Sequence, residues 1–266
     1  MSLRQTLCDS LKSKSHSTDF WLQASVFLFL GILFWPITQW LAESAQSQSR
    51  LLHALIVLVL ACSLLIKFSG IRIEEPFTLN RSSRTAVYLT FGLLLLQQVV
   101  QWLHPANYWS LIAIPAYVAG LASLLLFIFG QAAKRIIVTC SGTLGLFIFL
   151  STLMDFADWP LRALAGQWSG WILGHMGQSV QLGIHEGANA PAKLILLVNQ
   201  HPFHVASECN GFGAIMTCLL VACLLSLYKK LHPVRFIANL IAGIALGLAF
   251  NILRIVCIVL LAPQAP

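Results

Sequence analysis

Two short stretches near the C-terminal end of the chain contain residue types that can carry out covalent catalysis. One stretch precedes a long apolar run and combines a carboxylate, a thiol, an amide and a glycine, at Glu208, Cys209, Asn210 and Gly211. The other lies late in the next apolar run, where Arg254 follows Asn251 by three residues. A guanidinium within a segment of membrane length costs free energy, so such a residue usually has a partner or a function. We expect the cysteine to be that partner.

Cys209 differs from the other cysteines by its position at the expected start of a helix. There the helix dipole and the free N–H groups favour a thiolate, and a nearby Arg254 would lower the thiol pKa further. Five other cysteines lie within apolar runs and one lies in the polar N-terminal segment, so we expect no disulfides. These six residues are best explained as small apolar side chains: Cys8, Cys62, Cys140, Cys218, Cys223 and Cys257.

Helix rise predicts that Cys209 and Arg254 lie at the same depth. Cys209 is 21 residues before Lys230, a distance of roughly 32 Å along a helix, and Arg254 is 19 residues after Arg235, roughly 28 Å. Both distances start from the same basic loop, and the hydrocarbon core of a bilayer is about 30 Å thick. The thiol and the guanidinium should therefore meet at the opposite membrane boundary. The alternative for Arg254 is that it reaches from a helix end toward lipid phosphates.

The proposed chemistry also needs an acid–base group, and two histidines precede the cysteine. His201 and His204 lie eight and five residues before Cys209. A strand over Phe203–Ala206 would let His204 approach the thiol, whereas a lone loop histidine is more often simply solvated. The two histidines with Glu208 and Cys209 match no zinc-ligand spacing, so we expect neither a metal nor another cofactor.

Composition indicates a polytopic membrane protein. Apolar residues make up 58% of the 266 residues and charged residues 9%, whereas a soluble domain has about 25% charged residues. The net charge of +7 does not indicate a nucleic-acid partner, because the basic residues are scattered over short inter-helix loops. The long first apolar run after a polar N-terminus predicts a retained span, not a cleaved signal peptide.

The hydropathy pattern predicts an all-α protein with about seven transmembrane helices in one membrane domain over residues 1–266. We expect a five-helix part at 1–155, an extracytoplasmic loop at 156–208 and a catalytic helix pair at 209–262. With a cytoplasmic N-terminus, twelve of the sixteen Lys and Arg residues face the cytoplasm, which supports this orientation. The seven runs of membrane length lie near 21–42, 51–70, 84–103, 109–130, 136–155, 209–228 and 236–262.

The long loop at 156–208 predicts a small extracytoplasmic β element. Residues 159–175 are aromatic and contain glycine, which is typical of a helix lying in the outer interface. Residues 180–185 alternate in polarity, 187–189 favour a turn, and 193–199 and 203–206 are typical of short strands. Long loops are often lids or binding loops. A structural cap over the helix ends is an equally good interpretation.

Four features near the C-terminal end, taken in their order along the chain, resemble those of the exosortase/archaeosortase family. The resemblance consists of Phe-x-Val-Ala at 203–206, Glu-Cys-Asn-Gly-Phe at 208–212, a basic loop, and Asn-x-x-Arg at 251–254. It is strongest over about 170–262, and the ordered pair of cysteine and arginine motifs is more specific than either motif alone. The first five helices match mainly in hydropathy.

This resemblance implies a membrane-embedded cysteine transpeptidase or protease of the bacterial cytoplasmic membrane, acting at its outer face. Such enzymes process exported proteins whose C-terminal tail carries a short motif (Pro-Glu-Pro in PEP-CTERM substrates), one transmembrane helix and a basic cluster. The family nucleophile corresponds to Cys209 and the family arginine to Arg254. Cleavage by water and transfer to an amine acceptor are both compatible with the sequence.

The chain departs from the family pattern at two points. Asn210 stands where the family commonly has Ser or Thr. The family also has a third catalytic residue, His or Arg, on a further helix after Asn-x-x-Arg, whereas this sequence ends at Pro266. We therefore expect a C-terminally truncated sequence that lacks an eighth helix. In a complete chain the third role would be vacant or would belong to His204 or His201.

The competing class is a non-enzymatic membrane protein, such as a transporter or an assembly subunit for surface polysaccharide. In such a protein Arg254 would bind an anion, and Cys209 would have no functional role. A membrane-impermeant maleimide added outside separates the two classes. We expect rapid modification at neutral pH that is lost in Cys209→Ser, because a stabilised thiolate is the reactive form. Slow labelling with an ordinary thiol pKa would favour the transporter.

Overall fold

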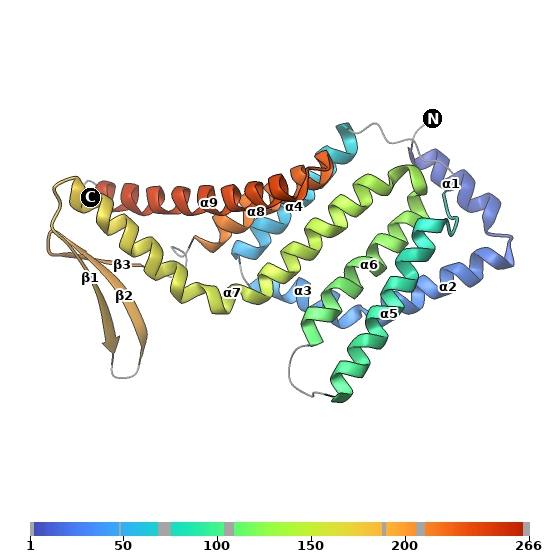
Figure 1. Ribbon diagram of the computed structural model, residues 1–266, viewed down its shortest axis with the longest axis horizontal. Coiled ribbons are helices and arrows are strands. Elements are labelled where there is room, and N and C mark those ends of the chain that lie inside the picture. Colours follow the sequence, from blue (N-terminus) through green and yellow to red (C-terminus); the bar gives the residue numbers. More distant parts are fainter. Residues whose placement is uncertain are drawn as a thin grey trace. The chain divides into compact units, whose positions relative to one another are not determined.

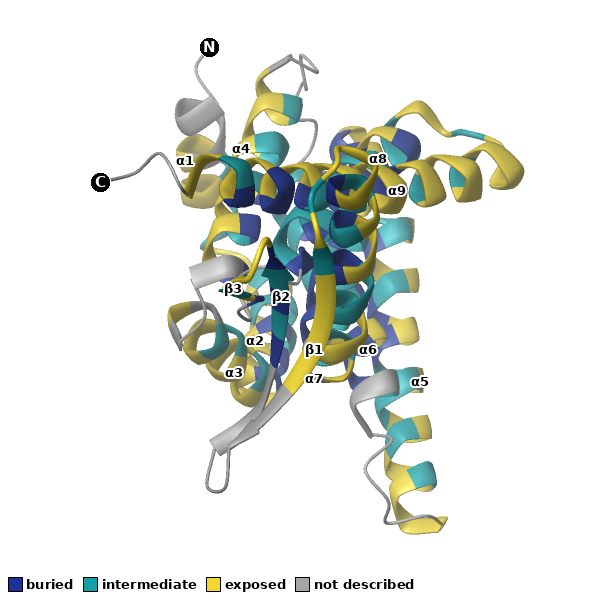
Figure 2. Cartoon of the chain, turned by 90° about the vertical axis from the view of Figure 1, so that its left-hand side faces the viewer, coloured by how far each residue is buried: buried dark blue, intermediate teal, exposed yellow. Residues whose placement is uncertain are grey.

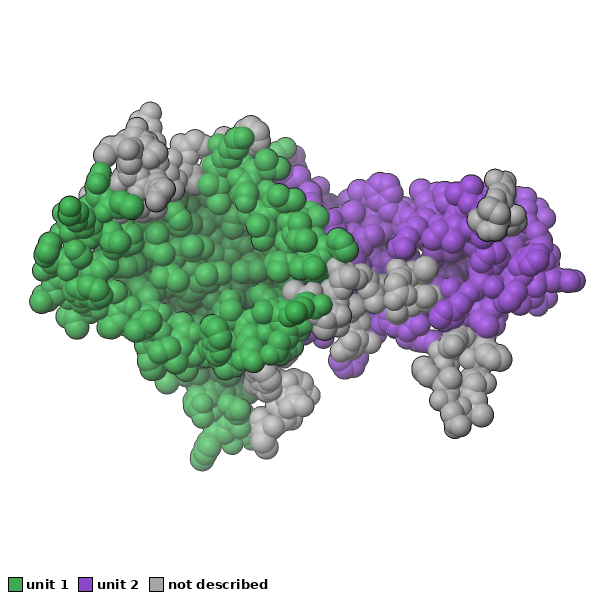
Figure 3. All heavy atoms as spheres, turned by 180° about the vertical axis from the view of Figure 1, so that it is seen from behind, with its two compact units in different colours: residues 1–149, 227–230 green, residues 150–226, 231–266 purple. Residues whose placement is uncertain are grey.

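The computed structural model describes residues 3–47, 49–68, 76–103, 109–187, 190–205 and 211–262, and these are mostly helical (Figure 1). The chain divides into two compact units, which Figure 3 shows in different colours. Unit 1 comprises residues 1–149 and 227–230, and unit 2 comprises residues 150–226 and 231–266. The expected division into parts at 1–155, 156–208 and 209–262 stays a prediction.

Unit 1 is a set of helices, most of them apolar. Aromatic rings pack between them, with Phe27 and Phe127 only 4.9 Å apart between ring centroids. The hydroxyl of Ser83 donates a hydrogen bond to the carbonyl of Ser123 at 3.0 Å, which links two neighbouring helices. The elements are α1 (Leu3–Lys14), α2 (Thr18–Leu33), α3 (Trp35–Ser47), α4 (Ser49–Phe68), α5 (Arg81–Leu103), α6 (Trp109–Phe129), the short η1 (Gln131–Ala133) and the first part of α7 (Lys134–His175).

The described helices confirm a polytopic membrane protein, with five or six spans in place of the expected seven. Five helical segments are long and apolar enough to cross a membrane, at Arg81–Leu103, Ile112–Phe129, Gln131–Leu153, Phe212–Lys229 and Pro233–Leu261. The predicted run at 21–42 is a pair of helices bent by 49°, and it provides a sixth span if the pair crosses as one. The predicted run at 51–70 contains only a shorter apolar stretch, Leu51–Lys67.

The bend between α2 and α3 has a local cause in the sequence. Pro36 is the second residue of α3, and proline has no N–H for a helical hydrogen bond. Its ring also clashes with the carbonyl four residues earlier when a helix continues unbroken. Helix α2 accordingly ends at Leu33, and α3 begins again at Trp35.

Unit 2 contains an antiparallel sheet of three strands in the order β1-β2-β3, which confirms the expected β element. The strands are β1 (Val180–Gly187), β2 (Ala190–Val198) and β3 (His201–His204). They follow the second part of α7 and precede α8 (Phe212–Lys229) and α9 (Pro233–Leu261). The expected helix at 159–175 is part of α7, which continues through Pro160. The extracytoplasmic location of the sheet and the interfacial location of this helix stay predictions.

The third strand begins earlier than the sequence indicated because of the turn that precedes it. Asn199 and Gln200 both have positive φ, 48° and 68°. Two such residues between paired strands are typical of a type I′ hairpin turn, which matches the twist of the sheet. Val198 therefore pairs with His201, and the strand starts there and not at Phe203.

One face of the sheet packs on α7, at Gly166 and Gly170, which allow a close approach. A Cβ atom on Gly166 would lie 3.2 Å from Leu182 and 3.3 Å from Leu194. Leu194 belongs to a buried cluster that also includes residues of α7 and residues from the end of α9, so the sheet, α7 and α9 share one core. Figure 2 shows β1 as largely exposed beside β2, whose described residues are buried or half-buried. The cluster consists of Ala165, Leu173, Leu194, Leu196, Val198, Val205, Ile255, Val256 and Val259.

Within unit 2, α8 and α9 run antiparallel with their backbones close together. A Cβ atom on Gly247 would lie only 2.4 Å from the Cα of Ile215. A Cβ atom on Gly243 would lie 3.2 Å from the carbonyl oxygen of Cys218. Small residues at such positions let membrane helices approach closely, so that van der Waals contact holds them together.

Gly247→Ala should destabilise the protein, because the new methyl group would meet the backbone of α8 and not a movable side chain. We expect a loss of about 1–3 kcal/mol, seen as a lower midpoint of thermal unfolding in detergent. Gly174→Ala in α7 is the matched control, because a Cβ atom there meets nothing within 4 Å. Equal midpoints for the two variants would contradict the close approach.

Candidate active site

The structure describes five of the eight residues that the sequence singled out. Gly211, Asn251 and Arg254 belong to the helix pair, and His201 and His204 belong to β3. Glu208, Cys209 and Asn210 lie outside the described residues. The geometry that bears on the candidate site therefore comes from the residues on both sides of the cysteine and from the end of α9.

Gly211 immediately precedes α8 and lies directly against Asn251 of α9. Its φ of +74° is a conformation that side chains rarely adopt, and its carbonyl accepts the N–H of Ile215 at 2.9 Å. A Cβ atom on Gly211 would lie 2.6 Å from the Cγ of Asn251. Asn251 is only 2% exposed. The positive φ and the closeness of Asn251 therefore both require glycine at position 211.

The contacts along α8 and α9 form a regular antiparallel register. The amide of Asn239 donates to the hydroxyl of Ser226 at 3.1 Å, near the loop between the helices. Further along come the contacts of Gly243 with Ala222 and Cys218, of Gly247 with Ile215, and of Asn251 with Gly211. Each turn forward on α9 thus meets one turn backward on α8. This register brings the beginning of α8 to within one helical turn of Arg254.

The chain on the other side of the cysteine is also anchored in unit 2. Val205 is 3% exposed, and its N–H donates to the carbonyl of Leu194 at 2.9 Å. It shares the buried cluster with Ile255, the residue after Arg254. The segment 206–210 therefore connects two residues that are fixed near the same part of α9, one beside Asn251 and one in the cluster of Ile255.

Arg254 is exposed and lies on the same face of α9 as Asn251, because residues three apart on a helix are neighbours. An exposed guanidinium with five N–H donors can bind a carbonyl oxygen or an oxyanion. Asn251 is buried against Gly211, one helical turn before Arg254.

The two histidines lie on β3 and are both exposed. His204 pairs with Ile195 and His201 pairs with Val198. Directly paired residues share a face of a sheet, so His204 is on the face opposite the buried cluster. Among the described residues, no group of three His, Cys, Asp or Glu side chains is arranged to hold a metal ion.

The sequence contains a further signal for the helix contact that pattern reasoning missed. Gly243 and Gly247 form a Gly-x-x-x-Gly motif within an apolar helix, which is typical of close helix packing in membranes. Combined with Gly211, this motif could have predicted the face of α9 that contacts α8. The anchoring role of Val205 has no comparable signal, because it depends on the register of β3.

Gly211→Ala should disturb the start of α8 for two reasons, the positive φ and the contact with Asn251. We expect a lower thermal midpoint, with the left-handed backbone alone accounting for about 1–2 kcal/mol. The Asn251→Gly background removes the steric part, so Gly211→Ala should cost less stability there than it does in the unmodified protein. Strictly additive losses in this double-mutant cycle would show that the two residues are not in contact.

Comparison with known proteins gives one match. The sequence model of the family described as transmembrane exosortase (EpsH) matches residues 45–265, which include every candidate site residue. No curated protein and no solved structure matches the chain.

Proposed function

The chain belongs to the transmembrane exosortase family, and we propose that it is a membrane-embedded cysteine transpeptidase or protease. Its substrates would be exported proteins with a C-terminal sorting tail, which it cleaves at the outer face of the bacterial cytoplasmic membrane. Members of this family are generally cysteine transpeptidases. Cys209 is the proposed nucleophile and Arg254 the proposed oxyanion-binding residue.

The contact between Gly211 and Asn251 is the observation that supports this assignment most directly. Cys209 precedes Gly211 by two residues, so the two Cα atoms are at most about 7 Å apart. Arg254 follows Asn251 by three residues, a helical rise of about 4.5 Å. One peptide carbonyl can therefore lie within reach of both the thiol and the guanidinium.

The proposed reaction begins with attack of the Cys209 thiolate on the scissile carbonyl carbon. A C–S bond forms, and the carbonyl electron pair moves to the oxygen, where Arg254 donates hydrogen bonds. Collapse of this intermediate breaks the C–N bond, and a histidine protonates the departing amine. His204 and His201 are the described candidates for that role. An amine acceptor or water then attacks the thioester and releases the thiolate.

The orientation of the protein in the membrane is part of the proposal. We place the N-terminus in the cytoplasm, because most Lys and Arg residues then face the inner side. The beginning of α8 and the end of α9 would then lie at the outer boundary, together with the sheet. This location suits a substrate that has crossed the membrane but is still held by its own transmembrane helix.

A processing assay tests the two catalytic assignments. The reporter is an exported protein with a tail that combines a Pro-Glu-Pro motif, one transmembrane helix and a basic cluster. Cys209→Ser should abolish cleavage, because the hydroxyl is a much weaker nucleophile. Arg254→Ala should reduce the rate by about 10²–10³, the usual effect of losing an oxyanion donor. Arg254→Lys should also lose most activity, because lysine lacks the planar set of donors.

Cys257→Ser is the matched control. Cys257 is an exposed cysteine on α9, three residues after Arg254, and the mechanism gives it no role. We expect its processing rate to equal that of the unmodified protein. Continued cleavage by Cys209→Ser, or loss of cleavage in Cys257→Ser, would show that the nucleophile is assigned wrongly.

A further inference from the structure

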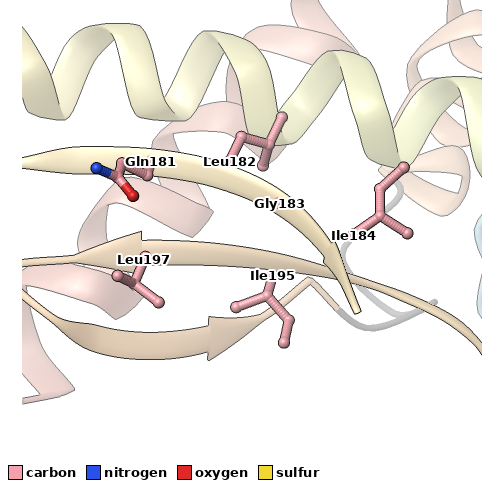
Figure 4. A pocket seen from close by; sticks show the side chains of 6 residues that line it. All are labelled: Gln181, Leu182, Gly183, Ile184, Ile195 and Leu197. Carbon is pink, nitrogen blue, oxygen red and sulfur yellow. The ribbon is translucent and has the colours of Figure 1, made fainter. Parts of the chain in front are cut away.

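Strands β1 and β2 carry a shallow hollow of about 250 Å³ (Figure 4). Its lining consists of Gln181, Gly183, Ile195 and Leu197, which lie on the face turned away from the buried cluster, together with Leu182 and Ile184 of β1. Leu182 points toward α7, whereas Ile195 points away from it (Figure 4). Gly183 faces the hollow, and a Cβ atom there would meet nothing within 4 Å. We call the face that carries Gln181, Gly183, Ile195, Leu197 and His204 the outer face of the sheet.

The strand register defines this face. Gln181 pairs with Leu197, Gly183 pairs with Ile195, and Ile195 pairs with His204 on its other side. Paired residues lie on the same side of a sheet, and the side alternates along each strand. The alternate positions Leu194, Leu196 and Val198 are buried in the cluster. Ile195 and Leu197 therefore give the outer face an apolar floor, which is bordered by the amide of Gln181 and the imidazole of His204.

The outer face is continuous with the candidate active site along the chain. His204 is the last residue of β3, and Val205 is the anchor that precedes segment 206–210. Cys209 lies only five residues after His204. A peptide whose scissile bond lies between the thiol and His204 would therefore have to pass the end of β3. His204, Ile195 and Gly183 are successive register partners across the sheet, so Gly183 lies two strands from His204 on the same face.

We propose that the outer face binds the extended stretch of the substrate peptide beside the scissile bond, with one apolar side chain in the hollow at Gly183. This inference rests on the proposed function and adds the place where the peptide is held. Extended peptides are commonly recognised on sheets, where pockets at alternate positions select side chains. The absence of a side chain at Gly183 creates the space, and Ile195 and Leu197 supply the apolar contact.

Filling the hollow tests the proposal. Gly183→Leu should be accepted by the fold, because its Cβ position is open and leucine suits a strand better than glycine. The new side chain would occupy the hollow, so the KM of the purified protein for the reporter should rise about tenfold, as expected for one lost apolar contact. The kcat should be unchanged, because binding and not chemistry is altered. Gly174→Leu, at an open glycine on α7, should leave both constants unchanged.

Photocrosslinking gives a second measurement that needs no turnover. Benzoylphenylalanine at position 197, in the Cys209→Ala background, should crosslink to the reporter tail within a few residues of the scissile bond. The same probe at position 174 should not. Crosslinks only to lipid or to a second copy of the chain would overturn the proposal, and so would an unchanged KM in Gly183→Leu.

The two proposals fail in distinguishable ways. If Cys209→Ser abolishes processing while Gly183→Leu processes normally and position 197 captures no tail, the enzyme assignment stands and the binding site is wrong. If the unmodified protein does not cleave the reporter, the function is wrong. In that case the crosslink at position 197 still decides whether the outer face binds the peptide.

Discussion

The close approach of α8 to α9 is the constraint on which the described geometry of the candidate site depends. Glycine on one helix meets backbone of the other at Gly247, and glycine at the start of α8 meets the buried Asn251. In lipid the hydrophobic effect does not drive helices together, so this contact depends on van der Waals packing between complementary surfaces. Because the contacts repeat turn by turn, they fix the register of the pair as well as its distance. That register is what brings the cysteine motif and the arginine motif to one end of the helix pair.

The sheet adds a second constraint at the same end. Its inner face shares a cluster with α7 and with Ile255, Val256 and Val259 of α9. The residue that leads out of the sheet, Val205, is therefore held near the residues that follow Arg254. Val205 and Gly211, the described residues on either side of segment 206–210, are thus each held by a separate contact within unit 2.

Hydropathy and alternation predicted much of the fold, and the reasons for the differences are local. Five of the seven expected spans are single helices of membrane length, and the sequence patterns predicted a strand at or overlapping each of the three that are present. The start of β3 depends on the positive φ of Asn199 and Gln200, which their residue types do not require. The face of His204 follows from that register, so no pattern in the sequence could assign it. The motifs themselves were evident as residue types, but their contact through Gly211 depends on a backbone angle and a buried neighbour.

Helix α9 meets α8 through Gly243, Gly247 and Asn251, and it meets the sheet through Ile255 and Val259. Each residue of a helix adds about 100° of rotation and 1.5 Å of length. A single insertion or deletion between Gly247 and Ile255 would therefore rotate the residues that contact α8 relative to the residues that contact the sheet. Only one of the two contacts could then be kept. The spacing along this helix is thus constrained more strictly than the identity of its lipid-facing side chains. Natural variation in α9 should consist of substitutions and not of changes in length.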